Sequence, residues 1–149
     1  MALAKTKRFG EIAVEIQTGT SPEVWTKPCG VRTKGFNRTA SMTETEVPDC
    51  DNEDLPADIV RDILSRSAEI PLAGALDSED LDVWDDWWDD GDTRNVRITV
   101  PGNAASGGRT YVGGFKLGTF NLGAERGARW TFEATLQSDG RVVRTNAAS

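Results

Sequence analysis

The side chains with the most obvious potential for chemistry are carboxylates in the middle of the chain. Six aspartates follow closely on one another, a density that suggests calcium binding: Asp82, Asp85, Asp86, Asp89, Asp90 and Asp92. A calcium-binding EF-hand loop requires an oxygen ligand at position 3, Gly at position 6 and Glu at position 12. With Gly91 at position 6, position 3 is Trp88 and position 12 is Arg97. We therefore predict no metal site and interpret these carboxylates as the solvated face of a helix.

Other groups that carry catalysis are scarce. The chain has no histidine, which excludes a Ser/His/Asp triad, a Cys/His dyad and an imidazole metal site within it. Cys29 and Cys50 are too few for a four-cysteine zinc site and are too far apart for a Cys-x-x-Cys motif. Whether they pair stays open. Glu133 is flanked by core-like residues, but the alternation around it makes it an outward strand residue. We predict no catalytic residue, no cofactor and no enzymatic activity.

The five tryptophans raise the question of a carbohydrate platform. Trp84, Trp87 and Trp88 lie at helical spacing, and Trp130 lies in a strand-like alternation. Packing in a core or an interface explains this pattern more simply than sugar binding does. The acidic helix is expected to bury the side that carries Leu81, Trp84 and Trp88.

Charge is distributed in three blocks. The net charge of −7 divides into +4 for residues 1–38, −16 for residues 39–93 and +5 for residues 94–149. Surfaces of opposite sign on one protein favour head-to-tail contact between its copies.

The elements that position these residues are mainly strands. A chain of 149 residues is the usual length of one domain, and we expect a single domain at 1–149 with an N-terminal arm at 1–9 and an acidic loop at 48–56. Polar and apolar residues alternate, or extended segments are indicated, at 11–17, 23–27, 68–76, 96–100, 111–122 and 130–137. The Thr-rich stretch 31–47 predicts a strand pair or one bent strand with a break at Gly35.

Two helices, a bulge and a hairpin turn complete the prediction. A helix is expected at about 77–90, ending at Gly91, and a short helix at about 57–65, after Pro56, with an apolar side of Ile59, Val60, Ile63 and Leu64. A bulge is expected near Gly118, and Asp139-Gly140 predicts a hairpin turn from which 141–144 return. The fold class is thus mainly β, a sandwich or barrel with one flanking helix and one short helix.

The order of these elements resembles the major tail tube protein of long-tailed bacteriophages. The resemblance covers most of the chain and is best at 107–140. It rests on Gly30-Val31-Arg32-Thr33, Val47-Pro48-Asp49, Asp90-Gly91, Val100-Pro101-Gly102, the Gly-rich segment 113–123 and the segment 130–140.

This resemblance implies a virion structural protein. It implies hexameric rings that stack into a tail tube, each subunit giving strands to a continuous inner barrel through which DNA passes. The partners would be copies of the chain itself, the terminator, tip and tape-measure proteins, and DNA that passes without specific binding, with no membrane. The protein would be made in the host cytoplasm and located in the virion tail.

Residue assignments follow from this expectation. Glu44 and Glu46, on the polar stretch, are the candidates for lining the lumen. Contacts between rings are expected to join acidic and basic residues, namely Asp49, Asp51, Glu53, Asp54 and Asp58 with Lys5, Lys7 and Arg8. Two alternatives remain open: a tail terminator or tail-tip ring protein of similar fold, and a carbohydrate-binding β-sandwich module.

Overall fold

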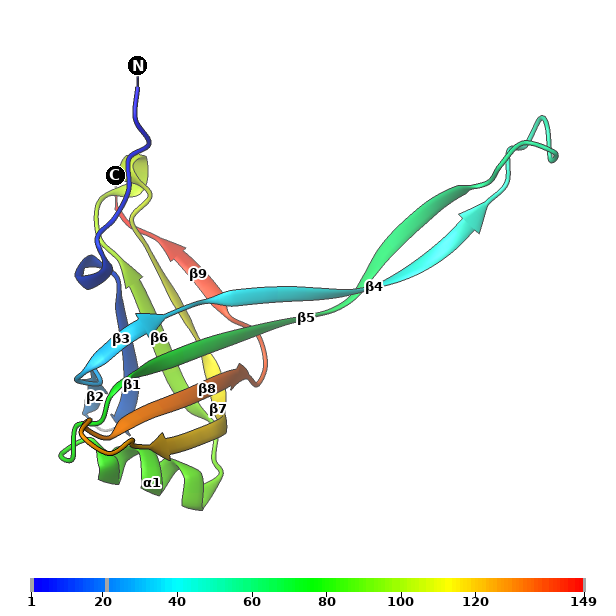
Figure 1. The fold of residues 1–149 in the computed structure, drawn as a ribbon. Helices are drawn as coiled ribbons and strands as arrows, with labels where there is room; N and C mark the ends of the chain where they lie inside the picture. The colour runs from blue at the N-terminus through cyan, green and yellow to red at the C-terminus, as the bar shows by residue number, and fades with distance from the viewer. Residues whose placement is uncertain (1, 21, 149) are drawn as a thin grey trace.

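One antiparallel sheet that curls on itself forms most of the molecule. The computed structural model describes residues 2–20 and 22–148. The sheet has the strand order β2-β1-β6-β7-β8-β5-β3, with β4 beside β5 and β9 beside β7. Its strands are β1 (Ala13–Thr20), β2 (Glu23–Thr26), β3 (Val31–Lys34), β4 (Asn37–Val47), β5 (Asp58–Ala75), β6 (Arg94–Val100), β7 (Arg109–Gly123), β8 (Thr131–Ser138) and β9 (Val143–Asn146). The prediction of a mainly β fold with one flanking helix is confirmed (Figure 1).

The core lies inside the curl of the sheet. Alternate residues of each strand point into it, as the period of two requires: the buried set includes Val14, Ile16, Val96, Ile98, Ile70, Leu72, Phe132 and Leu136. The helix α1 (Leu81–Asp90) lies at one end of the curl (Figure 1). A one-turn 3-10 helix, η1 (Phe9–Glu11), precedes β1, and another, η2 (Ala104–Ser106), connects β6 to β7. None of the helices in the described ranges is long and apolar enough to span a membrane.

Helix α1 buries a different face from the one expected. Trp84 and Trp87 are each 1% exposed, whereas Trp88 is 55% exposed. The Trp84 ring stacks on those of Trp87 and Phe120, at centroid distances of 6.3 and 5.4 Å. The Trp87 Nε1 donates a hydrogen bond of 2.8 Å to the Asp92 carbonyl. The helix ends at Gly91, whose φ of 65° is the left-handed conformation that favours glycine at this position.

The predicted short helix at 57–65 is wrong, because residues 58–65 belong to β5. Asp58 to Ser65 pair with Val47 to Ser41 of β4, with a register shift between Ser41 and Met42. Ile59 and Ile63 lie on one side of the hairpin, Val60 lies on the other and Leu64 lies at the bulge, so apolar residues on both sides produce a spacing that resembles a helix. Three of the four are β-branched and favour a strand. The expected break near Gly35 is confirmed, since β3 ends at Lys34 and β4 begins at Asn37.

The predicted hairpin return at 141–144 is also wrong. Strand β9 pairs with β7, from Arg109 to Val112, and not with β8. Strand β8 pairs with β7 from Phe115 onward, so β8 and β9 follow one another along the same edge of β7. The two glycines of β7 at this point let the connection pass closely, because a Cβ on Gly113 would lie 3.0 Å from the Val142 Cα. The predicted bulge near Gly118 is confirmed.

Candidate assembly surface

A long hairpin of β4 and β5 projects from the body of the molecule (Figure 1). Strand β5 leaves the body at Glu69, the last residue that pairs with β8. Beyond that point the two strands pair only with each other in the described part of the chain. A two-stranded hairpin alone is at best marginally stable in water. Yet this one exposes large apolar side chains to between 45% and 68%, namely Met42, Ile59, Val60, Ile63 and Leu64. Such a segment requires a cover.

The two faces of the hairpin have different chemistry. We call the core face the side of β4, β5, β8 and β7 that carries the buried Ala68, Ile70, Leu72, Phe132 and Leu136. Arg38 pairs with Ala68, so the even-numbered residues of β4, which has alternating side chains throughout, lie on this side. Beyond the body the core face carries the pairs Met42 with Ile63, Glu44 with Arg61 and Glu46 with Ile59. The core pattern therefore continues where this subunit has nothing to cover it.

Glu44 and Glu46, the predicted lumen residues, lie on this core face. The Glu44 Oε1 and the Arg61 Nε form an ion pair at 3.1 Å, with side chains 59% and 56% exposed. An ion pair this exposed contributes little stability by itself, about 0–1 kcal/mol. A cover that removed water from it would strengthen the attraction between the two charges, but would also cost their hydration.

The opposite side of the same four strands is rich in hydroxyl groups. We call it the hydroxyl face, and define it by Thr39, Ser41, Ser65, Ser67, Thr119, Thr131 and Thr135. Thr39 pairs with Ser67 and Ser41 with Ser65, Pro71 pairs with Thr135, and Thr135 pairs with Thr119. Each of these residues is exposed or half-buried. The curl of the sheet leaves this side outside the subunit's own core.

The hairpin ends in an acidic loop at the predicted position. Asp49, Asp51, Glu53 and Asp54 are all exposed there, and Asp58 begins β5. The Asp49 Oδ1 accepts hydrogen bonds from the Asp51 and Asn52 backbone amides, at 2.8 and 3.2 Å. These local bonds give the loop a defined shape while its other carboxylates stay free for contacts.

The predicted basic partners lie elsewhere on the subunit. Lys5, Lys7 and Arg8 are exposed in the segment before η1, at the N-terminal end, far from the hairpin tip in Figure 1. The structure therefore does not bring the acidic and basic groups together within one subunit. Any contact between them has to join different copies.

A groove at the base of the hairpin was not predicted. Arg38, Arg66 and Arg141 line it together with apolar side chains of Ile63, Ala68 and Val142. The Arg38 guanidinium lies over the rings of Phe36 and Tyr111, with its carbon 5.2 and 5.6 Å from their centroids. No local pattern in the sequence indicates this groove, because it forms only where β5 and the β8–β9 connection meet.

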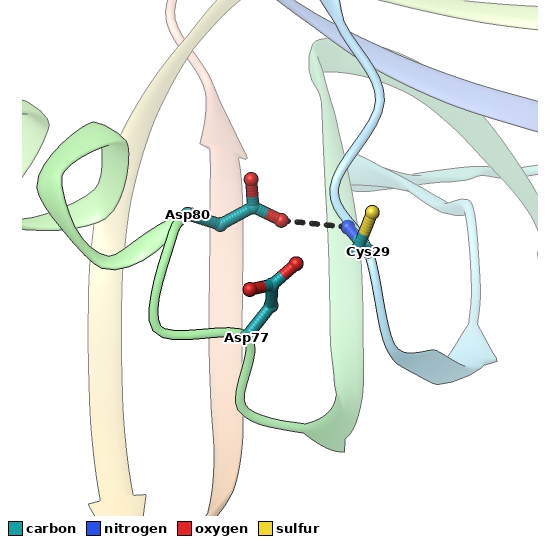
Figure 2. Close-up of side chains that lie close together, drawn as sticks. All are labelled: Cys29, Asp77 and Asp80. Carbon is teal, nitrogen blue, oxygen red and sulfur yellow. Dashed lines mark hydrogen bonds between the residues drawn. The ribbon is translucent and has the colours of Figure 1, made fainter.

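The structure also gathers Cys29, Asp77 and Asp80, whose ligand atoms all lie within 4.8 Å of one another (Figure 2). The Asp80 Oδ2 accepts a hydrogen bond of 2.7 Å from the Cys29 backbone amide, which joins the turn before β3 to the start of α1. The negative charge of Asp80, followed by burial and the charge of Asp77, raises the pKa of the Cys29 thiol. A protonated thiol is a poor nucleophile and a poor metal ligand. Cys29 and Cys50 are both free and exposed.

The exposed tryptophans fit the expectation of interface packing as well as they fit a sugar platform. Trp88 lies on α1 and Trp130 directly before β8, with exposures of 55% and 58%. Trp25 lies instead under the Arg97 guanidinium, whose carbon is 4.4 Å from the ring centroid. Arg97 in turn forms an ion pair of 2.8 Å with Glu15.

Comparison with known proteins identifies relatives of this arrangement. A family model described as phage tail tube protein matches residues 6–144. The tail of an empty GTA particle, refined helically with C6 symmetry, matches with a TM-score of 0.75 at 16% identity, over 94% of this chain and 99% of the other. The SPP1 tail tube matches with a TM-score of 0.62 at 10% identity, over 95% and 80%.

A third solved structure, the sheath/tube terminator of an extracellular contractile injection system (PVC), matches with a TM-score of 0.63 at 13% identity, over 97% and 99% of the two chains. A search of curated protein sequences found no match. At these identities the solved structures establish a shared fold.

Proposed function

Since this chain belongs to the phage tail tube protein family, and is therefore a structural protein of a tail tube, we propose that its copies close into hexameric rings that stack to form the tube. The C6 symmetry of the similar GTA tail supports the number of subunits in a ring. The observation that carries the proposal is the projecting hairpin, whose apolar core face has no cover within the subunit.

Two free strand edges support closure of the ring. Strands β3 and β4 follow one another along one edge of β5, at residues 72–74 and 58–69, and the outer edges of both have no strand partner in the described part of the chain. At the other end, β6 pairs with β7 only from Arg109 to Phe115, so among residues 2–20 and 22–148 no strand pairs with this edge of β7 from Lys116 onward. Unpaired edges are hazards unless something covers them. Since β3 and β4 both run opposite to β7 across the sheet, the β7 edge of one copy suits the β3 and β4 edge of the next in an antiparallel ladder.

The hairpin supplies the second contact. We place its core face against the body of another copy, where burial of the exposed half of Met42, Ile59 or Ile63 would contribute about 1 kcal/mol each. We assign the contact between rings to the acidic loop, with Asp49, Asp51, Glu53, Asp54 and Asp58 facing Lys5, Lys7 and Arg8. Their opposite charges and their separation on one subunit support this pairing.

The tube provides a passage for DNA in this proposal. The net charge of −7 disfavours retention of phosphates, which basic proteins bind through their lysines and arginines. The tube would belong to the virion tail after synthesis in the host cytoplasm, with terminator, tip and tape-measure proteins as its other partners. The shared fold with a tube terminator supports contact between similar surfaces at the end of the tube.

Negative-stain microscopy of the purified protein tests this function. We expect rings or tubes with a central channel and sixfold symmetry. A strictly monomeric protein at high concentration, with no tube in recombinant or particle samples, would contradict the proposal. The copy number per particle separates the alternatives, because a tube requires many rings and a terminator or tip only one.

A further inference from the structure

We propose that the hydroxyl face of β4, β5, β8 and β7 forms the wall of the lumen, so that DNA passes over threonine and serine side chains. This inference rests on the proposed tube. It assigns the lumen to Thr39, Ser41, Ser65, Ser67, Thr119, Thr131 and Thr135.

The first argument is burial. A sheet that closes into a ring has one face toward the channel and one away from it. The core face cannot line the channel, because Ile70, Leu72, Phe132 and Leu136 are at most 2% exposed inside the subunit. The hydroxyl face lies on the opposite side of the same strands and meets water.

The second argument is the composition of the two faces. Besides its hydroxyl groups, the hydroxyl face carries the amides of Asn121 and Gln137. Its charged residues in the body of the subunit are Glu69, Glu133 and Lys116. Glu69, Gln137 and Lys116 form one row across three strands. These side chains offer a phosphate one cation against two carboxylates, which gives little to hold DNA by.

The third argument is the position of the arginines. Arg38, Arg61 and Arg66 pair with Ala68, Glu44 and Ala40, and all three therefore lie on the core face. Arginine binds phosphate through two parallel hydrogen bonds and is the side chain most able to hold a passing strand. The hairpin carries its arginines on the face turned away from the proposed wall. The same register puts Glu44 and Glu46 on the core face, which makes Glu44 a direct test of the assignment.

Thiol labelling of assembled tubes tests the wall. In a background with C29S and C50S, the variants Ser67→Cys and Thr135→Cys place a thiol on the proposed wall, Glu44→Cys on the core face and Asp86→Cys on the exposed side of α1. Each is treated with N-ethylmaleimide and with a maleimide carried on a long polyethylene glycol chain, before and after assembly. Both reagents should label all four variants before assembly.

After assembly, Ser67→Cys and Thr135→Cys should keep their labelling by N-ethylmaleimide, which enters the channel, and lose labelling by the polymer. Asp86→Cys should react with both, and Glu44→Cys should react with neither, because a neighbouring copy covers it. Polymer labelling of Ser67→Cys or Thr135→Cys in tubes would overturn the wall assignment. So would a Glu44→Cys variant that, in tubes, reacts with N-ethylmaleimide but not with the polymer.

A failure to assemble has a different meaning for the variants and for the parent protein. The substitutions are small and lie at exposed or half-buried positions, so folding should be retained. If Ser67→Cys or Thr135→Cys folds but forms no tubes, its position lies in a contact between copies. That result would overturn the assignment of the hydroxyl face to the lumen. A parent protein that forms no tubes would overturn the proposed function itself.

Discussion

Trp84 is the residue on which the packing of α1 depends most. It is 1% exposed and its ring contacts those of Trp87, Phe120 and Phe132. It thereby joins the helix to β7 and β8, the strands that we place in the tube.

Replacement of Trp84 should destabilise the subunit strongly. We expect Trp84→Ala to lower the free energy of unfolding by about 3–5 kcal/mol, because it leaves a cavity among aromatic rings. Trp88→Ala is the matched control, four residues further along the same helix, and should change the stability by no more than about 0.5 kcal/mol. Denaturant titration of the monomeric protein measures both. Equal effects would contradict the burial of one tryptophan and the exposure of the other.

Cys29 should react slowly with electrophiles. The charge of Asp80 raises the pKa of its thiol, so a smaller fraction is thiolate at neutral pH. We expect Asp80→Asn to lower that pKa and to speed alkylation of Cys29, because the amide oxygen keeps the backbone hydrogen bond while the charge is lost. The pH dependence of labelling in a C50S background measures this. Cys50, in a C29S background, should label at a rate that Asp80→Asn does not change.

The sequence predicts individual core residues well where a strand alternates without interruption. Phe132, Ala134 and Leu136 are buried as their period requires. It placed Trp88 in the core in error, because helical spacing alone does not fix which of two neighbouring tryptophans faces the sheet. The approach of Asp80 to Cys29, 51 positions apart, has no local signal in the sequence.

At the scale of elements, the projecting hairpin is the part whose exposure to water should differ most between the free subunit and the assembled one. Its apolar residues are about half exposed in the subunit, so they contribute less to folding than to whatever covers them.

Charge on the core face of the hairpin should therefore block assembly with little effect on folding. We expect the double variant M42D/I63D to remain a folded monomer, with a free energy of unfolding changed by about 1 kcal/mol or less, and to form no tubes. Ser41→Asp lies next to Met42 on the hydroxyl face and should still assemble. Sedimentation and electron microscopy report assembly, and denaturant titration reports folding. Tubes formed by M42D/I63D would contradict the role of this face.

The sequence predicted strands and loops here but not their pairing. The acidic loop and the break near Gly35 are where the residues indicated. The short helix at 57–65 was wrong because the hairpin carries apolar residues on both of its sides, Ile59 and Ile63 on one and Val60 on the other, which together imitate a helical spacing. The return after Gly140 was wrong because Asp139 donates its amide to the Gly114 carbonyl, at 2.8 Å, and β9 then follows β7. Pairings of this kind depend on residues distant in sequence, which local patterns do not encode.

At the scale of the whole molecule, the separation of charge gives the subunit two ends of opposite sign. The acidic loop lies at the tip of the hairpin and the basic arm at the N-terminal end (Figure 1). The three-block charge pattern was visible in the sequence, whereas the distance between the blocks was not.

Stacking of rings should accordingly depend on salt and on these charges. We expect neutralisation of the loop by D49N/D51N/E53Q/D54N to shorten tubes, and raised salt to shorten those of the parent, because exposed charges are screened over about 8–10 Å at 0.1–0.15 M salt. The control D82N/D85N/D86N removes carboxylates from α1 and should leave the tube length unchanged. Tube lengths measured by microscopy across a salt series provide the readout. Parent tubes whose length does not respond to salt would contradict the assignment.

The hairpin has a consequence for how growth stops. If each ring extends its hairpins onto the next ring, then every completed ring presents the same set of uncovered hairpins as the ring before it. A contact of this head-to-tail type repeats without an internal end point. The contacts of the subunit therefore specify how the next ring is added but not how many rings are added. On this arrangement a different molecule has to set the final length of the tube.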